Sequence, residues 1–301
     1  MRATAVVRDR SAVSPAVALE LLKPVTWFPP MWAFGCGLIS AGAGSAMRWP
    51  VVLAGVILCG PLVCGTSQAV NDWFDRHVDA INEPGRPIPS GRLPGRSGLY
   101  IAIAWTCISL LVATVLGTVG VLATIFGLAL AWAYSAPPLR LKRNGWLGNS
   151  AVGLCYEGLP WVTGAAVVAA SRPDWRVFLI AALYSTGAHG IMTLNDFKSV
   201  NGDRKFGINS LPVMLGDASA ARLACVVMAA AQAAVIGLLA LWNAMPHAGG
   251  VLLLLLAQLL LMRKLLRRPR ELAPWYNATG VSLFVLGMLI SAFALRSLAG
   301  S

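Results

Sequence analysis

The chain has 301 residues, of which 57% are hydrophobic and only 12% are charged, and its mean hydropathy is +0.69. This composition excludes a water-soluble domain and a disordered chain, and the 30 Gly and 18 Pro, which follow no fixed period, exclude a collagen-like fibre. Its 24 basic and 12 acidic residues give a net charge of +12, which in a membrane protein first reports topology. We therefore expect an integral membrane protein embedded in the lipid bilayer, with no nucleic-acid partner.

Apolar stretches of membrane-spanning length follow one another along the chain. A helix needs about 20 apolar residues to cross the hydrocarbon layer. By this criterion the sequence predicts nine transmembrane helices, which cover residues 26–46, 51–75, 99–116, 118–135, 147–169, 177–196, 219–242, 248–266 and 275–296. The predicted fold is an all-α bundle with an N-terminal segment, 1–25, followed by one nine-helix membrane domain, 26–298.

The basic residues are divided unequally between the two sides of the predicted membrane. With nine helices, the N-terminus and the connections after the second, fourth, sixth and eighth helices lie on one side. All but four of the Lys and Arg residues fall there, the exceptions being Arg48, Arg172, Arg176 and Arg296. The positive-inside rule then predicts a cytoplasmic N-terminus and a periplasmic C-terminus. The first 25 residues match neither a signal peptide nor a transit peptide, which favours a bacterial inner membrane, cytoplasmic or intracytoplasmic and photosynthetic.

The six cysteines lie in apolar stretches and form no CxxC pair. They are Cys36, Cys59, Cys64, Cys107, Cys155 and Cys225. We interpret them as small buried hydrophobic residues, and not as disulfides or metal ligands.

Six of the twelve acidic residues fall in two short windows, the first of which is residues 71–91 at the end of the second predicted helix. Asp72, Asp75 and Asp79 are spaced i, i+3 and i+7, so one narrow stripe of a helix carries three carboxylates. A solvated helix tip tolerates such a stripe, but a hard divalent cation explains it better. Mg²⁺ prefers oxygen ligands and is often shared between carboxylates and a substrate phosphate.

The second window, residues 195–216, follows the sixth predicted helix. Asp196 and Asp203 are spaced i, i+7 if that helix continues, with Ser199 between them, although Gly202 could end the helix sooner. Basic residues accompany both windows: Arg76, Arg86 and Arg92 in the first, and Lys198, Arg204 and Lys205 in the second. Both windows are cytoplasmic by the charge distribution, so the sequence predicts one site for a metal-bound diphosphate facing the cytoplasm. An ion-coupled transporter is the alternative from another class.

Two more ionisable residues lie within predicted helices. Glu157 precedes Gly158 and Pro160, and we interpret it as a contact of the acceptor or of the active-site loop, with helix packing as the alternative. His189 lies seven residues before Asp196 and so shares its helical face. A hydrogen-bonded core histidine and a ligand to a pigment magnesium both remain open for His189.

The two acidic windows resemble the UbiA-type superfamily of intramembrane prenyltransferases, whose mark is an NDxxDxxxD motif and a second Asp-rich motif four helices later. Asn71, Asp72, Asp75 and Asp79 match the first motif. Within that superfamily the chain looks like the members that esterify bacteriochlorophyllide, from about Leu19 to Leu298. The blocks that carry this likeness are WFPPMWAFGCG, QAVNDWFDRHVDAINEPGRPIPSGR, AYSAPPLRLKRNGWLGN, CYEGLPWVTGA, GAHGIMTLNDFKSVNGDRKFGINSLPVMLG and APWYNATG.

The resemblance implies a nine-helix bundle that transfers a geranylgeranyl or phytyl group from its diphosphate to the propionate of bacteriochlorophyllide a. It implies Mg²⁺ as cofactor, with Asp72, Asp75 and Asp79 beside Asn71 as one ligand set and Asp196 with Asp203 as a second. The implied substrate contacts are Asn71, Arg86, Lys142, Arg143, Glu157, Asn195, Lys198, Arg204 and Lys205. Asn201 departs from the family pattern, which is usually acidic there. Chlorophyllide or an aromatic quinone precursor is the alternative acceptor, and pigment-synthesis proteins are candidate partners.

Overall fold

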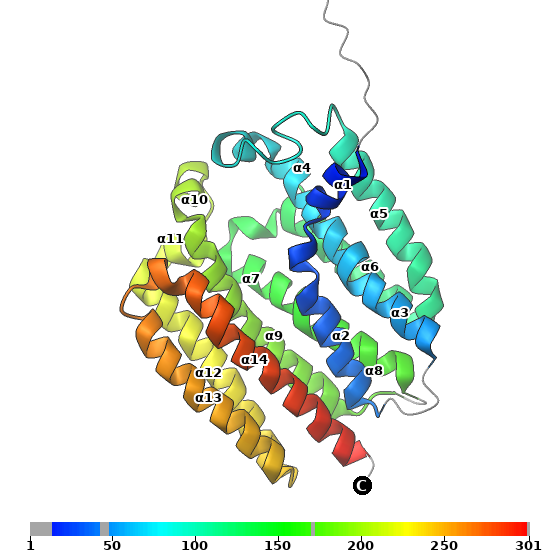
Figure 1. The fold of residues 1–301 in the computed structure, drawn as a ribbon, viewed down its shortest axis with the longest axis vertical. Helices are drawn as coiled ribbons and strands as arrows, with labels where there is room; N and C mark the ends of the chain where they lie inside the picture. Colours follow the sequence, from blue (N-terminus) through cyan, green and yellow to red (C-terminus); the bar gives the residue numbers. More distant parts are fainter. Residues whose placement is uncertain (1–13, 43–47, 170–171, 300–301) are drawn as a thin grey trace, which may run out of the picture.

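A computed structural model describes residues 14–42, 48–169 and 172–299, and these residues form an assembly of helices (Figure 1). The N-terminal half contains α1 (Pro15–Leu22), η1 (Pro24–Thr26), α2 (Phe28–Ser40), α3 (Trp49–Ile57), η2 (Leu58–Cys64), α4 (Gly65–Asn82), α5 (Ser97–Ala113), η3 (Thr114–Leu116) and α6 (Gly117–Ser135). The remainder contains η4 (Leu141–Arg143), α7 (Gly145–Gly153), η5 (Leu154–Gly158), α8 (Leu159–Val168), α9 (Trp175–Asn195), η6 (Asp196–Lys198), α10 (Val200–Phe206), α11 (Leu211–Leu215), α12 (Asp217–Leu241), α13 (Met245–Leu265) and α14 (Pro269–Ala299). The predicted all-α class is confirmed.

Seven helical runs of the described residues are long and apolar enough to cross a membrane. One of them, Ser97–Ser135, contains two of the predicted spans, because η3 joins α5 to α6 without a polar connection. The first predicted span, 26–46, corresponds to α2, which has only 13 residues, and residues 43–46 lie outside the described part. The multi-pass membrane architecture therefore stands, while the count of nine spans is not confirmed by length and composition.

Two of the long helical runs contain a π-helical turn. In the run from α3 to α4 the turn is η2, where Pro61 has no backbone N–H to give to the helix. In the run from α7 to α8 it is η5, which contains Glu157 and is followed by Pro160. Side chains beside the two turns meet, because Gln68 Nε2 donates to the Tyr156 hydroxyl over 3.2 Å and Cys64 Sγ lies 3.5 Å from the same oxygen. The turns thus join the two runs next to the first acidic motif.

The helices α2 and α8 approach each other at two glycines. A Cβ on Gly37 would collide with the carbonyl oxygen of Trp161, and one on Gly164 would collide with that of Phe34. Small residues of this kind allow membrane helices to pack backbone to backbone. This packing buries Trp161, whose ring stacks on Tyr184 of α9 with centroids 5.6 Å apart. The core therefore fixes the position of α9, which ends in the second acidic motif.

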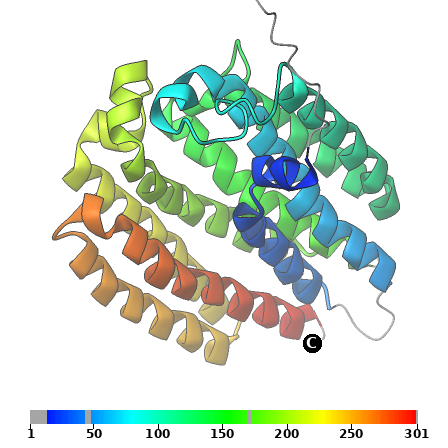
Figure 2. The same cartoon turned by 45° about the horizontal axis from the view of Figure 1, so that its top comes forward.

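Both acidic motifs lie at one end of the molecule. Figure 1 places the C-terminal end of α4 at the same end as α10 and α11, and the C-terminus of α14 at the opposite end. Figure 2, in which this end comes forward, shows the connection after α4 curling beside α1. The predicted convergence of the two motifs on one end is confirmed.

The cysteines differ in part from the prediction. All six are free thiols, as expected, but only Cys36, Cys64 and Cys225 are buried. Cys59 and Cys155 are half-buried and Cys107 is exposed on α5. The prediction of burial was wrong for Cys107, because an apolar stretch predicts contact with either protein or lipid and does not distinguish the two.

Candidate active site

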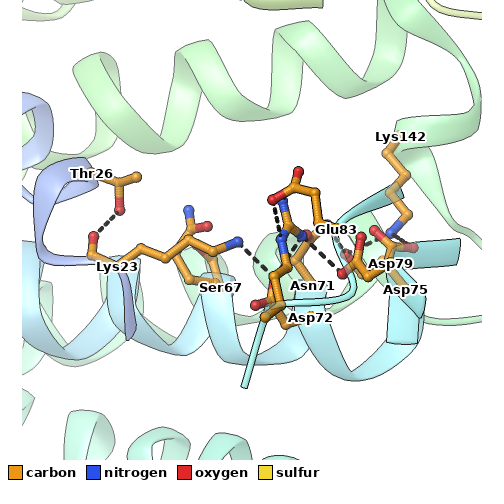
Figure 3. A network of polar contacts seen from close by, with 12 residues as sticks. Lys23, Thr26, Ser67, Asn71, Asp72, Asp75, Asp79, Glu83 and Lys142 are labelled. Carbon is orange, nitrogen blue, oxygen red and sulfur yellow. Dashed lines mark hydrogen bonds and ion pairs between the residues drawn. The ribbon is translucent and has the colours of Figure 1, made fainter. Parts of the chain in front are cut away.

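The first acidic motif lies on α4 as the i, i+3, i+7 spacing predicts. Asp72, Asp75 and Asp79 project from one side of the helix toward the same polar network (Figure 3). Asp72 is 1% exposed and Asp79 is 6% exposed, so these carboxylates are held away from solvent. Carboxylates buried this close to one another require positively charged partners, because an unpaired buried charge costs much free energy.

Basic side chains from three segments supply those partners. Lys23 Nζ donates to Asp72 Oδ1 over 2.6 Å, from the turn that follows α1. Arg86 Nη1 lies 3.3 Å from the same oxygen and 2.8 Å from Asp79 Oδ2. Lys142 Nζ donates to Asp75 Oδ1 over 2.5 Å, so Lys23 and Lys142 reach the stripe from opposite sides (Figure 3). The desolvation of Lys142 lowers its pKa, which the charge of Asp75 partly opposes.

Two arginines in the segment after α4 hold this segment against the end of α4 and against α1. Arg86 makes a two-pronged contact with Glu83, at 2.7 and 2.6 Å, and this hydrogen bonding lowers the pKa of Glu83. Arg92 makes the same kind of contact with Glu20 of α1, at 2.6 and 2.7 Å, and also donates to the Gly85 carbonyl over 2.6 Å. Planar guanidinium groups fix carboxylates by paired bonds of this kind. The loop and α1 are therefore held together beside Asp72.

Asn71, the first residue of the motif, turns toward the end of α6. Its Nδ2 donates to Ser135 Oγ over 3.2 Å, and Lys142 Nζ lies 3.5 Å from the same hydroxyl. Ser135 is fully buried. It therefore joins the NDxxDxxxD motif to the basic segment that follows α6.

The second acidic motif is not one continuous helix. α9 ends at Asn195, η6 occupies 196–198, and α10 begins at Val200, so Asp196 and Asp203 do not share a helical face by i, i+7 spacing. Gly202 lies inside α10, and the idea that it ends the helix was wrong. At the break the Ser199 hydroxyl lies 3.0 Å from the Asp196 carbonyl oxygen and 3.0 Å from Asp203 Oδ2, so its single proton is shared between a backbone and a side-chain acceptor.

Each carboxylate of the second motif accepts hydrogen bonds from neutral side chains. Asp196 Oδ2 accepts from Asn149 Nδ2 of α7 over 3.1 Å. Asp203 Oδ2 accepts from Ser199 Oγ at 3.0 Å and Ser210 Oγ at 2.7 Å. Burial raises the pKa of Asp203, and the negative charge of Asp75 raises it further. The two motifs are thus close enough to interact electrostatically.

Several predicted substrate contacts lie apart from the carboxylates. Asn195 Oδ1 accepts from Asn277 Nδ2 of α14 over 2.7 Å. Arg143, Lys198, Arg204 and Lys205 are exposed, and within the described residues none of them forms an ion pair with a carboxylate. Of the predicted cations, the structure brings only Arg86 and Lys142 into contact with the acidic motifs. The roles of the others stay predictions.

Glu157 and His189 are both buried, at 4% and 7% exposure. Glu157 Oε2 has no hydrogen-bond partner, and no cation of the site contacts it. The expected contact of Glu157 with the active-site loop is therefore absent from the described part of the chain. His189 Nε2 has no hydrogen-bond partner among the described residues, and both interpretations of this residue stay open.

Sequence reasoning missed Lys23 and Asn149. Lys23 contributed to the prediction only as one of the basic residues that indicate topology, although its place next to Pro24, just before the predicted membrane domain, could have indicated a fixed position. Asn149 is 3% exposed in an apolar helix, and a buried amide in such a setting signals a specific partner. Neither residue has a spacing that points to the distant aspartate it contacts.

Asn201 is directed away from the second motif, since its Oδ1 accepts from Arg270 Nη2 over 2.7 Å. We expect Asn201→Glu to pair with Arg270 and to leave the Mg²⁺ concentration for half-maximal activity unchanged within about twofold, because an exposed pair contributes little. A Mg²⁺ titration of both proteins checks this. A marked fall in the Mg²⁺ requirement would instead place residue 201 among the metal ligands.

The donor chemistry of the first motif fits Mg²⁺. The motif supplies carboxylate oxygens, which Mg²⁺ prefers as ligands. One of them, Asp72 Oδ2, is buried without a hydrogen-bond partner and so is free to bind a metal ion. As the side chains lie, however, no three His, Cys, Asp or Glu residues among those described are gathered closely enough to hold an ion. The carboxylates are paired with Lys23, Arg86 and Lys142, so metal binding requires these cations to shift.

Comparison with known proteins decides the family. The family model of the UbiA prenyltransferase family matches residues 27–292. The chain belongs to this family. It is 59% identical to the "Bacteriochlorophyll synthase 33 kDa chain" of Cereibacter sphaeroides over 97% of both chains, and 56% identical to that of Rhodobacter capsulatus over 95% of both. A UbiA homolog from Archaeoglobus fulgidus bound to DMAPP and Mg²⁺ has a TM-score of 0.69 at 20% identity, covering 93% of this chain and 99% of that one.

As a member of the UbiA prenyltransferase family, the chain is a multi-pass membrane prenyltransferase with the UbiA-type fold. The match covers the helices that carry both acidic motifs, from α2 to α14. The polar network at the end of α4 is therefore the natural candidate for the prenyl-diphosphate site.

Proposed function

We propose that this chain transfers a geranylgeranyl or phytyl group from its diphosphate to the propionate carboxylate of bacteriochlorophyllide a. The identity of 59% over 97% of both chains with the bacteriochlorophyll synthase 33 kDa chain carries this proposal. The polar network beside α4, with its carboxylates and cations, supplies groups suited to a magnesium diphosphate.

We assign the metal-binding role to Asp72, Asp75 and Asp79 on one side and to Asp196 and Asp203 on the other. Bound Mg²⁺ would neutralise charge that develops on the departing diphosphate. Asn149 and Ser210, which donate to Asp196 and Asp203, would orient those carboxylates.

We assign diphosphate binding to Arg86 and Lys142, and add Lys23. These three cations contact the carboxylates directly, so a short movement would bring each to the oxygens of a diphosphate. Guanidinium and ammonium donors in a site with little water stabilise negative charge on a leaving group far more than in bulk solvent. Arg143, Lys198, Arg204 and Lys205 are exposed and would act at longer range.

The chain needs no strong general base for this reaction. The acceptor is a carboxylate, which is ionised near neutral pH and attacks through its own oxygen. The tasks left to the protein are to orient the two substrates and to keep water from the allylic carbon. The burial of Asp72, Asp79 and Ser135 beside the site is consistent with exclusion of water.

We further propose that the site faces the cytoplasm of a bacterial inner membrane, with the C-terminus in the periplasm. The support is the charge distribution, since the basic segments around α4, η4 and α10 lie at one end and the C-terminus of α14 at the other (Figure 1). The cations Arg2, Arg8 and Arg10, which also favour this orientation, lie outside the described residues.

A paired-acceptor assay tests the activity. Membranes containing the chain are incubated with Mg²⁺, geranylgeranyl diphosphate and either bacteriochlorophyllide a or chlorophyllide a, and the esters are separated by chromatography. We expect the ester of bacteriochlorophyllide a to form faster, and Asp72→Asn membranes to form both esters far more slowly than membranes with the unmodified chain. Preference for chlorophyllide a would replace the acceptor assignment, and no ester from either pigment would favour an aromatic quinone precursor as acceptor. The transporter alternative would be favoured if Asp72→Ala abolished solute uptake in vesicles but left prenyl transfer intact.

A further inference from the structure

A short backbone bridge joins the segment between η4 and α7 to the segment between α10 and α11. Asn209 donates its amide to the Arg143 carbonyl over 3.0 Å, and its own carbonyl accepts from the Gly145 amide over 2.8 Å. These two bonds form a parallel β-bridge between Asn144 and Asn209, with no other β-pairing in residues 14–42, 48–169 and 172–299. Two connections far apart in the sequence are thus held side by side.

Gly145 lets the two backbones approach closely at this bridge. A Cβ on Gly145 would lie 2.6 Å from the Leu211 backbone nitrogen and 3.1 Å from the Asn209 carbonyl oxygen. Both atoms belong to the main chain, so a side chain at this position can be accommodated only if the bridge opens. Gly145 is also buried. The bridge is therefore a closely packed contact and not a chance meeting of two loops.

One end of the bridge is continuous with a cation of the first acidic motif. Arg143 ends η4, a single turn that also contains Lys142. Lys142 Nζ donates to Asp75 Oδ1 over 2.5 Å. The turn packs on α7, because a Cβ on Gly148 would lie only 3.1 Å from Lys142 Cα. The backbone position of Lys142 is thus set by the bridge on one side and by α7 on the other.

The other end of the bridge holds Asp203 of the second motif. Ser210, which follows Asn209, donates through its hydroxyl to Asp203 Oδ2 over 2.7 Å. Ile208, which precedes Asn209, donates its amide to the Asp203 carbonyl over 2.9 Å. Both neighbours of the bridging residue therefore fix Asp203, one through the carboxylate and one through the main chain.

α7 adds a second contact with this motif. Asn144 caps the helix, since its Oδ1 accepts from the amides of Trp146 and Leu147 over 3.0 and 3.2 Å. One turn further on, Asn149 donates to Asp196 Oδ2 over 3.1 Å. Among the described residues no single side chain donates to carboxylates of both motifs. The eight residues 142–149 contact both motifs instead, through different side chains and the bridge.

We infer that the bridge between residues 143–145 and Asn209 is a positioning device, which couples the two acidic motifs so that they bind one magnesium diphosphate together. This inference rests on the proposed function. Gly145 and Asn209 are then positioning residues, which act through Lys142 and Ser210 and do not touch the substrate. Because coupling is reciprocal, a diphosphate that engages Lys142 also stabilises the arrangement around Asp203.

Affinity measurements on the purified full chain in detergent test this coupling. The probe is geranylgeranyl S-thiolodiphosphate with Mg²⁺, an analogue whose C–S bond resists cleavage, and no acceptor is present. It is titrated into the unmodified chain, Lys142→Met, Ser210→Ala and the double variant. If the two motifs bound the probe independently, the two losses of affinity would multiply in the double variant. We expect the loss in the double variant to be at least about fivefold smaller than that product.

The same four measurements are repeated with Gly145→Ala added, because the new Cβ displaces the backbone at Leu211 or Asn209. We expect Gly145→Ala to weaken binding of the probe about tenfold, and the losses from Lys142→Met and Ser210→Ala then to multiply within about twofold. Gly237→Ala is the matched control. A Cβ on Gly237 of α12 meets no neighbouring atom within 4 Å, so affinity and coupling should both stay unchanged.

The bridge is distinguished from the shared probe by this comparison. Coupling that survives in Gly145→Ala would pass through the probe and would overturn the inference, as would losses that multiply in the otherwise unmodified chain. If Gly145→Ala does not accumulate, Asn209→Pro removes the amide that donates to Arg143 and gives the same comparison.

Hydrogen exchange of the unmodified chain needs no variant of the bridge. A saturating concentration of the probe should slow exchange of the Gly145 and Asn209 amides severalfold, and unchanged rates would also overturn the inference. The paired-acceptor assay tests ester formation by the unmodified chain independently. Losses that multiply, together with normal esterification, would therefore reject the bridge and leave the proposed function standing.

Discussion

Asp72→Asn is expected to lower the rate of prenyl transfer by about 10²–10³-fold. Asparagine keeps the shape of the side chain but loses the charge that holds Lys23 and Arg86 at 2.6 and 3.3 Å. It also replaces Asp72 Oδ2, the buried oxygen without a partner, so the proposed metal loses its most protected ligand. Initial rates with geranylgeranyl diphosphate and bacteriochlorophyllide a, measured over a range of Mg²⁺ concentrations, provide the measurement.

Asp174→Asn is the control for this change. Asp174 is the N-cap of α9, where its side chain accepts from the Arg176 amide, and asparagine serves that position about as well. We expect the control to retain the unmodified rate. Breaking a buried ion pair can also destabilise a fold. The thermal unfolding of the Asp72 variant and its elution in size-exclusion chromatography are therefore compared with those of the control, to show that lost activity does not come from lost folding. Full activity of a folded Asp72→Asn protein at saturating Mg²⁺ would refute the ligand assignment.

Lys142→Met is expected to reduce kcat/KM for the prenyl diphosphate by about 10²-fold, because it removes a desolvated cation from the proposed site. The Lys142 side chain is only 8% exposed and its ammonium bonds to Asp75 over 2.5 Å. Methionine preserves the length of the side chain and most of its packing. Steady-state kinetics with the prenyl diphosphate varied at a fixed acceptor concentration give the value.

Arg143→Met is the matched control, one residue along the same turn. Arg143 is exposed and forms no ion pair with the acidic motifs, so we expect a change within about threefold. The sequence alone treats the two cations alike, whereas the structure separates them. Similar losses in both variants would mean that Arg143 moves into the site when the substrate binds.

Much of the fold could be predicted from the sequence, because membrane helices are specified by local properties. The length of the apolar stretches and the Pro and Gly residues between them indicated where the helices lie. The alignment of Asp72, Asp75 and Asp79 on one side of α4 followed from the period of the α-helix. The second motif was less predictable. Its helix breaks at η6, where a single Ser199 hydroxyl competes for the backbone, and helical periodicity does not report such a bond.

The net charge of +12 gives the topology of the chain, but it does not say which cation contacts which carboxylate. The sequence by itself determined the class of protein, the position of the basic connections and the residues of both acidic motifs, because hydropathy, charge and short-range spacing are local. Only the tertiary structure decided which cations meet which carboxylates: Lys23 reaches Asp72 across 49 positions and Lys142 reaches Asp75 across 67. Such long-range pairs depend on how the helices pack, through contacts such as those of Gly37 and Gly164, and no local pattern encodes them.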